Sequence, residues 1–229
     1  MTNSVTTGRL PHKSVRTIET QEKSNEITAI PAFLDWLDVR GATVTIDAMG
    51  CQKAIAEKII DKGGDYLLAL KGNQGNLHDD VRLHFEHPDV SSLANMTTTE
   101  TYDKGHGRVE VRRCRVSQAI AWLKQRHPEW HKLTSIVAID SERHIGESVT
   151  KETRYFISSK AATADQLLAA VRLHWGIDNQ LHWVLDMSFG EDQSRIRKDN
   201  APTNVAIIRH AALNMIRQAQ KKRTSIKLM

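Results

Sequence analysis

The sequence has few cysteines and no long apolar run. Its two cysteines, Cys51 and Cys114, stand far apart and belong to no C-x-x-C pair, which excludes a disulfide framework and a zinc ribbon. No apolar stretch reaches the roughly 18 residues that a membrane span needs, and the start, MTNSVTTGRLPHKSVRTIE, has no apolar signal core. We therefore expect a protein of the cytoplasm with reduced thiols and no membrane contact.

Motifs for nucleotide binding are missing as well. The chain contains neither G-x-G-x-x-G nor G-x-x-x-x-G-K-[ST], which argues against an α/β nucleotide-binding protein, and it has no internal repeat. What is present is an ordinary globular composition, with 40% hydrophobic and 26% charged residues in 229 positions, enough for one large domain or two small ones. The net charge of +5 modestly favours a polyanionic partner.

The spacing of apolar residues predicts a β-α-β unit near the front of the chain. A helix is expected over 26–37, followed by a β-branched strand over 42–47, an amphipathic helix over 54–64 that ends at a pair of glycines, and a buried strand over 65–73. Both strands are nearly continuous apolar runs, as in parallel sheets with helices on both faces. The expected fold class is therefore α/β.

The rest of the chain is expected to be rich in strands and then helical. After a short helix over 77–85, alternating residues predict a long hairpin from TTTETYD and RVEVRRCRV, and SIVAID and VTKETRYFISS predict further strands. A helix containing Trp122 and Trp130 is expected within this stretch. The last helices are expected over about 163–187 and 203–219.

Two acidic residues have positions that suggest chemistry. In HWGIDNQLHWVLD, Asp178 lies at the middle of an apolar helical stripe, so its carboxylate should point inward and meet a cation, a donor or a metal. Asp47 ends a strand, at the edge where open α/β sheets bind ligands. An ordinary ion pair for Asp178 and a helix cap for Asp47 remain as alternatives. Together, two such carboxylates are typical of a site in which Mg²⁺ ions hold a phosphodiester.

Three long motifs carry a resemblance to a known family. VTIDAMGCQKAIAEKIIDKGGDYLLALKGNQG, DKGHGRVEVR and HWGIDNQLHWVLDMSFGEDQSRIRKDNAP resemble, in order and spacing, the H-repeat-associated insertion-sequence transposases, over residues 20–220. This family is of the DDE class, and the resemblance implies an RNase H-like mixed sheet flanked by helices, with an inserted antiparallel β-rich region. It also implies Mg²⁺ or Mn²⁺ as the cofactor, with Asp47 as the second acidic residue of a catalytic, metal-binding triad and Asp178 as the third.

The resemblance divides the chain into five segments. They are a polar arm (1–25), part of the RNase H-like catalytic core (26–90), the β-rich insertion (91–160), the carboxyl-terminal helices of the core (161–220) and a basic tail (221–229).

The sequence departs from the family at two catalytic positions. The family has Glu where this chain has Asp178; the shorter side chain retracts the carboxylate by about 1.5 Å, and misplacement of about 1 Å can cost roughly 10²-fold in rate. The first catalytic Asp of the family lies on an apolar strand, in a segment resembling A-I-D-G-K, and this chain shows no such strand. None of six other acidic residues is a convincing replacement, because they lie in polar segments, on the first predicted helix or in the β-rich region: Glu19, Glu22, Glu26, Asp35, Asp38 and Asp140.

Basic, amide and aromatic residues are assigned to DNA contacts, mainly with phosphates. They are Lys71, Asn73, Gln74, His106, Arg108, Arg112, Arg113, Trp175, Asn179, His182, Arg195, Arg197 and Lys198. A generic turn for KGNQGN, solvated charge for the arginines and a core position for Trp175 and Trp183 are the ordinary alternatives, and the core position is the main expectation for both tryptophans. A zinc site from His174, Asp178 and His182 is disfavoured, because their spacing spreads the ligands over about 12 Å of helix.

The sequence thus predicts the carboxyl-terminal portion of a DDE transposase that lacks the central strand of its sheet. The ancestral activity would be metal-dependent DNA cleavage and strand transfer, with an incomplete metal site and no activity left in this copy. The alternative is a non-catalytic DNA-binding remnant that modulates a full-length transposase. The expected partners are DNA at the element ends and a full-length transposase or a second copy of this chain, close to the nucleoid.

Overall fold

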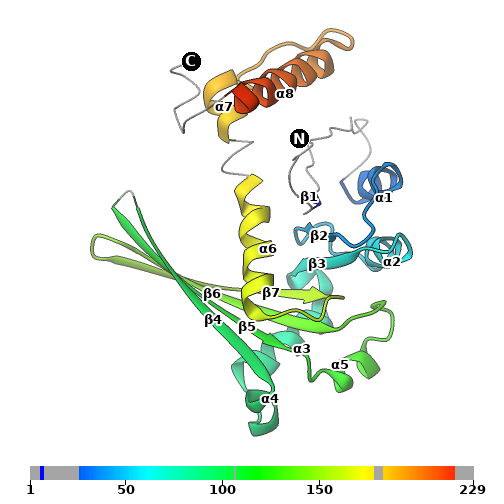
Figure 1. The fold of residues 1–229 in the computed structure, drawn as a ribbon, viewed down its shortest axis with the longest axis vertical. Helices are drawn as coiled ribbons and strands as arrows, with labels where there is room; N and C mark the ends of the chain where they lie inside the picture. The colour runs from blue at the N-terminus through cyan, green and yellow to red at the C-terminus, as the bar shows by residue number, and fades with distance from the viewer. Residues whose placement is uncertain (1–5, 8–25, 106, 178–182, 220–229) are drawn as a thin grey trace.

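The described strands form one mixed sheet of seven strands (Figure 1). The computed structural model describes residues 6–7, 26–105, 107–177 and 183–219. The strands are Thr6–Thr7 (β1), Thr43–Ile46 (β2), Asp65–Leu70 (β3), Met96–Gly105 (β4), Arg108–Ser117 (β5), Ser135–Ile145 (β6) and Ser148–Ser158 (β7). Their order is β1-β2-β3-β7-β6-β5-β4, in which only β2 and β3 are parallel neighbours. The predicted α/β class is confirmed.

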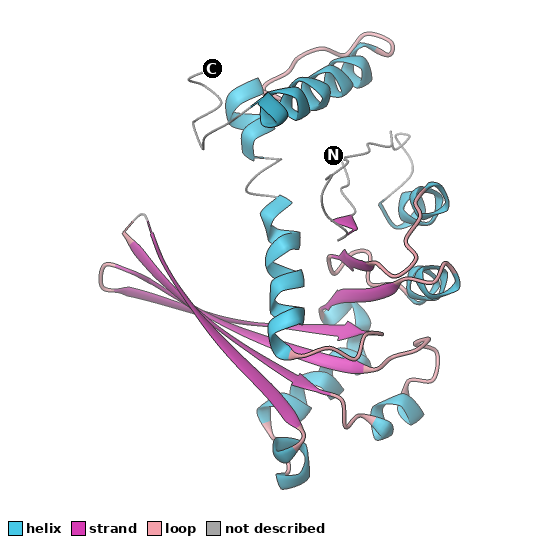
Figure 2. Cartoon of the chain, in the orientation of Figure 1, coloured by secondary structure: helices cyan, strands magenta, loops and turns pink. Residues whose placement is uncertain are grey.

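Helices lie on both faces of this sheet (Figure 2). They are Glu26–Trp36 (α1), Lys53–Asp61 (α2), Gly75–Glu86 (α3), Val90–Ala94 (α4), Ala121–Arg126 (α5), Ala164–Ile177 (α6), Trp183–Phe189 (α7) and Ala201–Ala219 (α8), with a 3-10 turn at Gly72–Gln74 (η1). Helices α1, α2, α3 and α5 share one buried apolar cluster with the sheet, and α6 packs on the opposite face. Leu185 of α7 packs against Leu213 of α8. None of the described helices is long and apolar enough to cross a membrane.

The predicted β-α-β unit is confirmed as β2, α2 and β3. Buried residues of α2 recur one turn apart, at Ile55 and Ile59, which keeps one side of the helix on the sheet. The helix stops where Gly63 adopts a positive φ of 74°, and the N–H groups of Gly63 and Gly64 bond to carbonyls of the last turn. The glycine pair thus returns the chain to β3, parallel to β2.

The edge of the sheet beyond β2 is sparsely paired among the described residues. There, Thr6 and Thr7 of β1 pair with Thr45 and Val44. Most of β2 is nevertheless buried, with Val44 fully inaccessible. A strand buried in this way usually has neighbours on both sides, because unpaired backbone groups away from water are costly. Residues 1–5 and 8–25, on either side of β1, lie outside the described part of the chain, so the missing strand stays a prediction.

The β-rich segment continues the same sheet rather than forming a separate layer. β7 pairs with β3 from Leu67↔Ser158 to Leu70↔Tyr155, so the antiparallel strands extend the sheet away from β2. Two helix predictions need comment. The helix expected over 163–187 is described as α6 and α7, with 178–182 outside the described residues. The prediction that one helix carries both Trp122 and Trp130 is wrong, because α5 ends just before the His-Pro pair at 127–128, and a residue before proline disfavours helix.

Candidate functional site

Asp47 directly follows β2, at the carboxyl end of the strand. Its side chain is exposed, and Oδ1 accepts hydrogen bonds from the backbone N–H groups of Met49 (3.2 Å) and Gly50 (3.4 Å). A side chain at position 50 would run into Ile46, so glycine is needed for the chain to turn this closely. The carboxylate therefore stabilises the turn in which it lies, while the N-cap of α2 is Gln52.

The loop after β3 lies against this turn, as the sequence predicts for the KGNQGN segment. Two amide side chains join the loops by donating to backbone carbonyls, Asn73 Nδ2 to Ala48 O and Gln74 Nε2 to Cys51 O, each at 2.7 Å. Because both amides already have these acceptors, exposed Lys71 is the residue of this loop best placed to hold an anion near Asp47.

A cavity of about 630 Å³, here called the Asp47 cavity, opens beside the two loops. Its volume lies in the range of small-ligand sites, about 300–1,000 Å³. Its polar and aromatic lining includes Asp47, Lys71, Asn73, His78, Glu152, Arg154, Tyr155 and Trp175. The core position expected for Trp175 is wrong, since the residue is 39% exposed. Leu167, Leu168 and Val171 form the buried side of α6, and Trp175 lies one turn beyond them, at the cavity.

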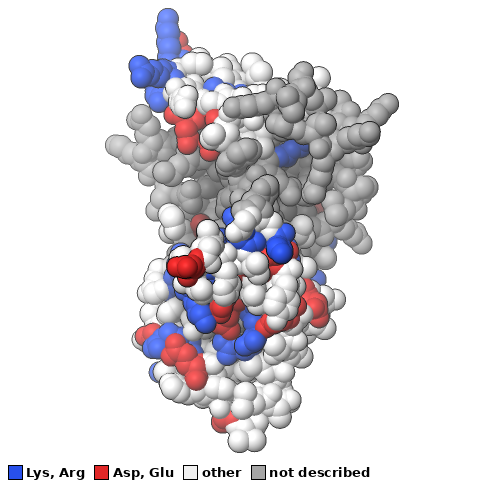
Figure 3. Space-filling model, turned by 90° about the vertical axis from the view of Figure 1, so that its left-hand side faces the viewer, with Lys and Arg blue, Asp and Glu red and all other residues white. Residues whose placement is uncertain are grey.

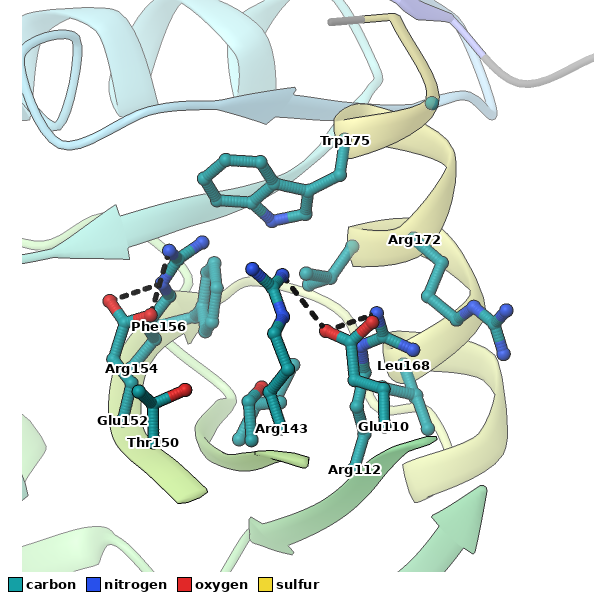
Figure 4. A pocket seen from close by; sticks show the side chains of 14 residues that line it. Glu110, Arg112, Arg143, Thr150, Glu152, Arg154, Phe156, Leu168, Arg172 and Trp175 are labelled. Atoms are coloured by element: carbon teal, nitrogen blue, oxygen red, sulfur yellow. Dashed lines mark hydrogen bonds and ion pairs between the residues drawn. The ribbon is translucent and has the colours of Figure 1, made fainter. Parts of the chain in front are cut away.

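A second cavity of about 620 Å³ adjoins the first and is shown in Figure 4. We call it the arginine cavity, after Arg112, Arg143, Arg154 and Arg172 in its lining. Its floor is the sheet face on which α6 packs. This face changes from apolar to charged along the strands, since Val116, Val137 and Phe156 are followed farther out by two cross-strand rows. The rows are Arg112-Ser141-Glu152 and Glu110-Arg143-Thr150.

The arginines of this cavity are held by carboxylates. Glu110 is 8% exposed and lies 2.6 Å from Arg112 and 3.4 Å from Arg143. Arg154 donates to both oxygens of Glu152, at 2.7 and 2.9 Å, and this interaction lowers the pKa of Glu152. The Arg154 guanidinium also lies 4.1 Å from the centre of the Trp175 ring, a cation-π contact. These contacts fix the side chains that separate the two cavities.

Acidic and basic side chains are interleaved on the molecular face that Figure 3 shows, rather than gathered by sign. In the arginine cavity, Arg112 and Arg172 also share Asp103, at 2.6 and 2.9 Å. Four arginines thus face three carboxylates around this cavity. The face as a whole is therefore not strongly positive. A negatively charged ligand would bind through the arginine N–H groups that the carboxylates do not use.

The arginines predicted on the hairpin do not share one surface. Arg112 points into the arginine cavity, whereas Arg113, the next residue of β5, pairs with Glu100 at 2.7 Å. Successive residues of a strand face opposite sides, so these two arginines cannot follow one DNA backbone together. Arg108 is exposed at the start of β5.

The other predicted site residues are dispersed or lie outside the described residues. Arg195, Arg197 and Lys198 are exposed before α8. His174 does not stand alone on α6, since its Nδ1 lies 3.1 Å from Thr45 Oγ1 of β2. Four predicted residues fall outside the described part of the chain: His106, Asp178, Asn179 and His182. The juxtaposition of Asp47 with Asp178 therefore stays a prediction.

The donor set for a metal is incomplete within the described residues. They contain no group of three or more His, Cys, Asp or Glu side chains arranged to hold an ion. Three other acidic residues are held in ion pairs, Asp35 with Lys58 at 2.6 Å, Asp38 with Arg40 at 2.9 Å and Asp140 with Arg115 at 3.0 Å. Asp47 offers the hard oxygen ligand that Mg²⁺ prefers, but by itself it does not make a site.

Sequence reasoning missed Glu110, Arg143 and Arg154 as residues of the site. A signal was present, because β7 carries Glu152 and Arg154 two positions apart and β5 carries Glu110 and Arg112 in the same pattern. Such spacing puts both charges on one face of a strand. The sequence did not show that α6 would cover only part of this face.

Comparison with known proteins gives a consistent result. A family model described as "Transposase DDE domain" matches residues 5–215. "Putative transposase YncI" of Escherichia coli O157:H7 is 42% identical over 213 residues, which cover 92% of this chain and 54% of that protein. "H repeat-associated putative transposase YhhI" of Escherichia coli K12 is 42% identical over 203 residues, 87% of this chain and 53% of that protein. The chain therefore spans about half the length of the curated relatives it matches.

Proposed function

The chain belongs to the transposase DDE domain family, and on this premise we propose that it acts in DNA transposition, on the ends of an insertion sequence. In this proposal it binds DNA through phosphates and contributes Asp47 as one carboxylate for metal-dependent cleavage and strand transfer. The place of Asp47 carries the proposal: it stands at the carboxyl end of β2, in a cavity that also contains Lys71 and Arg154.

The residues of the Asp47 cavity suit a phosphodiester. Lys71 and Arg154 supply positive charge for the phosphate oxygens. The hydrogen bond that Asp47 accepts from the N–H of Met49 holds the carboxylate in the turn that lines the cavity. In the DDE family, divalent ions such as Mg²⁺ or Mn²⁺ stabilise the attacking and leaving oxygens. Asp47 would be one ligand of such an ion, and Asp178 is proposed as another.

Cleavage by this chain alone is not expected. The described residues supply one carboxylate of the expected triad, and Asp178 is one methylene shorter than the Glu of the family. Each shortfall weakens a mechanism that needs ions on both sides of the scissile phosphate. For this chain itself we therefore propose DNA binding and metal binding at Asp47. Cleavage and strand transfer are proposed only for the longer members of the family.

The proposal is tested by measuring Mn²⁺ bound to the chain in the presence of DNA, by electron paramagnetic resonance. Wild type is expected to bind Mn²⁺ and Asp47→Ala to lose this binding. Asp35→Ala is the matched control, since Asp35 is an exposed carboxylate on α1 that already pairs with Lys58. Equal Mn²⁺ binding by wild type and Asp47→Ala would overturn the assignment of Asp47, and so would the absence of DNA binding at low salt.

A nicking gel with plasmid DNA that carries an element end tests the expected inactivity. No Mg²⁺- or Mn²⁺-dependent product is expected from wild type. Metal-dependent product that disappears in Asp47→Ala would contradict inactivity and show that a further acidic residue completes the site.

The second candidate function is a non-catalytic DNA-binding protein that modulates a full-length transposase. What favours it is Asp178, whose side chain is shorter than that of the Glu found at this position in the family. In that case the chain should reduce cleavage by a full-length relative, and Asp47→Ala should reduce it equally. The Mn²⁺ measurement separates the two candidates, since only the first requires Asp47 to bind metal.

A further inference from the structure

The arginines of the arginine cavity keep donors that their carboxylate partners do not use. A guanidinium carries five N–H donors in a planar fork. Within the described part of the chain, Arg143 contacts Glu110 through Nη2 alone, and Arg154 contacts Glu152 through Nε and Nη2. Figure 4 shows the Arg143 side chain rising from the floor towards Trp175. A ligand with acceptor oxygens would therefore find donors inside the cavity.

Buried Glu110 explains how these donors are held in place. Its carboxylate lies between Arg112 and Arg143 on the floor of the cavity, so it orients both forks while most of its own surface is covered by protein. Several guanidinium groups oriented in this way match the oxygens of phosphate diesters better than they match a neutral ligand. The chemistry points to a polyphosphodiester.

The dimensions of the cavity indicate which form of nucleic acid it accepts. About 620 Å³ is the volume of a site for a ligand of nucleotide size. A duplex, whose major groove alone is about 12 Å wide, is too large to enter. An unpaired strand can enter, because it can present one phosphate after another to the guanidinium groups of the lining.

The arginine cavity adjoins the Asp47 cavity. Both are lined by Glu152, Arg154, Phe156 and Trp175, so a strand that leaves one cavity at these shared side chains can enter the other. We propose that the arginine cavity binds an unpaired DNA strand through its phosphates, with Arg143 and Arg154 as the contacting residues, and that this strand continues from the phosphodiester at Asp47. The inference rests on the proposed function in that DNA is taken as the substrate.

The test is a salt titration of DNA binding by fluorescence anisotropy, in EDTA, with labelled oligothymidylate and with a duplex of equal length. The variant is Arg143→Ala combined with Arg154→Ala. Each lost phosphate contact should reduce the slope of log K against log salt by about 0.7 for a single strand, so the double variant should lose about 1.4. The slope for the duplex should not change.

The matched control is Lys151→Ala. Lys151 lies on β7 with Arg154, is exposed and pairs with a carboxylate, Glu142, at 2.9 Å, but it lies on the opposite face of the sheet. It should leave the single-strand slope unchanged. Arg143→Lys, which keeps the charge, should retain most of the slope. Glu110 keeps its partner Arg112 when Arg143 is removed, and circular dichroism checks that the double variant is folded.

The outcomes separate this inference from the proposed function. A single-strand slope that falls equally in Lys151→Ala, or a slope unchanged in the double variant, would overturn the inference while leaving Mn²⁺ binding at Asp47 untouched. Conversely, an arginine-dependent slope for single strands supports the inference even if Asp47→Ala binds Mn²⁺ like wild type. The absence of single-strand binding at low salt would also overturn it.

Discussion

Gly50→Ala should destabilise the protein through the turn that carries Asp47. A Cβ at this position would lie 2.8 Å from Ile30 Cδ1 and closer still to Ile46 Cγ2. Both isoleucines are buried in the cluster beneath β2, so they have little room to move. Overpacking costs about 1–3 kcal/mol, and each kcal/mol lowers Tm by about 2–4 °C for a chain of this size, which gives a loss of about 2–12 °C.

Thermal unfolding followed by circular dichroism measures this loss, with Gly72→Ala as the control. A Cβ at Gly72 meets no atom within 4 Å, and this glycine lies in the neighbouring loop, beside Lys71. Both substitutions remove the same backbone freedom from the unfolded chain, which by itself stabilises slightly. The two variants therefore differ mainly in the space around the new methyl group. Equal Tm values for the two variants would refute the steric argument and the view that the turn is closely packed.

Two further predictions concern titratable groups in the core. Burial lowers the pKa of His84 below its usual 6.5, so its stabilising contribution is complete above that pH and is lost as the pH falls through the lower folded value. The free energy of unfolding in urea should therefore fall less between about pH 7 and pH 5 in His84→Phe, which keeps the stacking on Trp122, than in wild type. An equal fall in both proteins would contradict this. Burial raises the pKa of both Cys51 and Cys114 to about 12, so neither thiol should react with a disulfide reagent in the native protein, and both should react in denaturant.

Local elements were predictable because their signal lies within one segment. The β-α-β unit follows from two apolar runs and an amphipathic helix that ends at Gly63 and Gly64. The contact between the Asp47 turn and the KGNQGN loop was also predictable, because each follows a strand of this unit and parallel neighbours bring their carboxyl ends to one edge. These inferences need no knowledge of distant residues.

The arginine cavity was not predictable, because it depends on the register between strands and on how much of the sheet α6 covers. Nothing local specifies that Glu110 stands opposite Arg143, or that Arg112, Ser141 and Glu152 form one row. The exposure of Trp175 likewise depends on where α6 runs past the apolar part of the sheet. In contrast, the separation of Arg112 from Arg113 follows from strand alternation and was available from the sequence.

The pairing of β3 with β7 has a consequence for the order of folding. The loop that this contact closes runs over residues 71–154, whereas β4 to β7 pair with their successive neighbours. Local hairpins form before contacts that require a long loop to close, because loop closure costs entropy before the contact repays it. During synthesis, β2 and β3 leave the ribosome well before β7 exists. Until then the apolar edge of β3 has no partner, and a nascent chain at this stage is exposed to mispairing with other strands and to capture by chaperones.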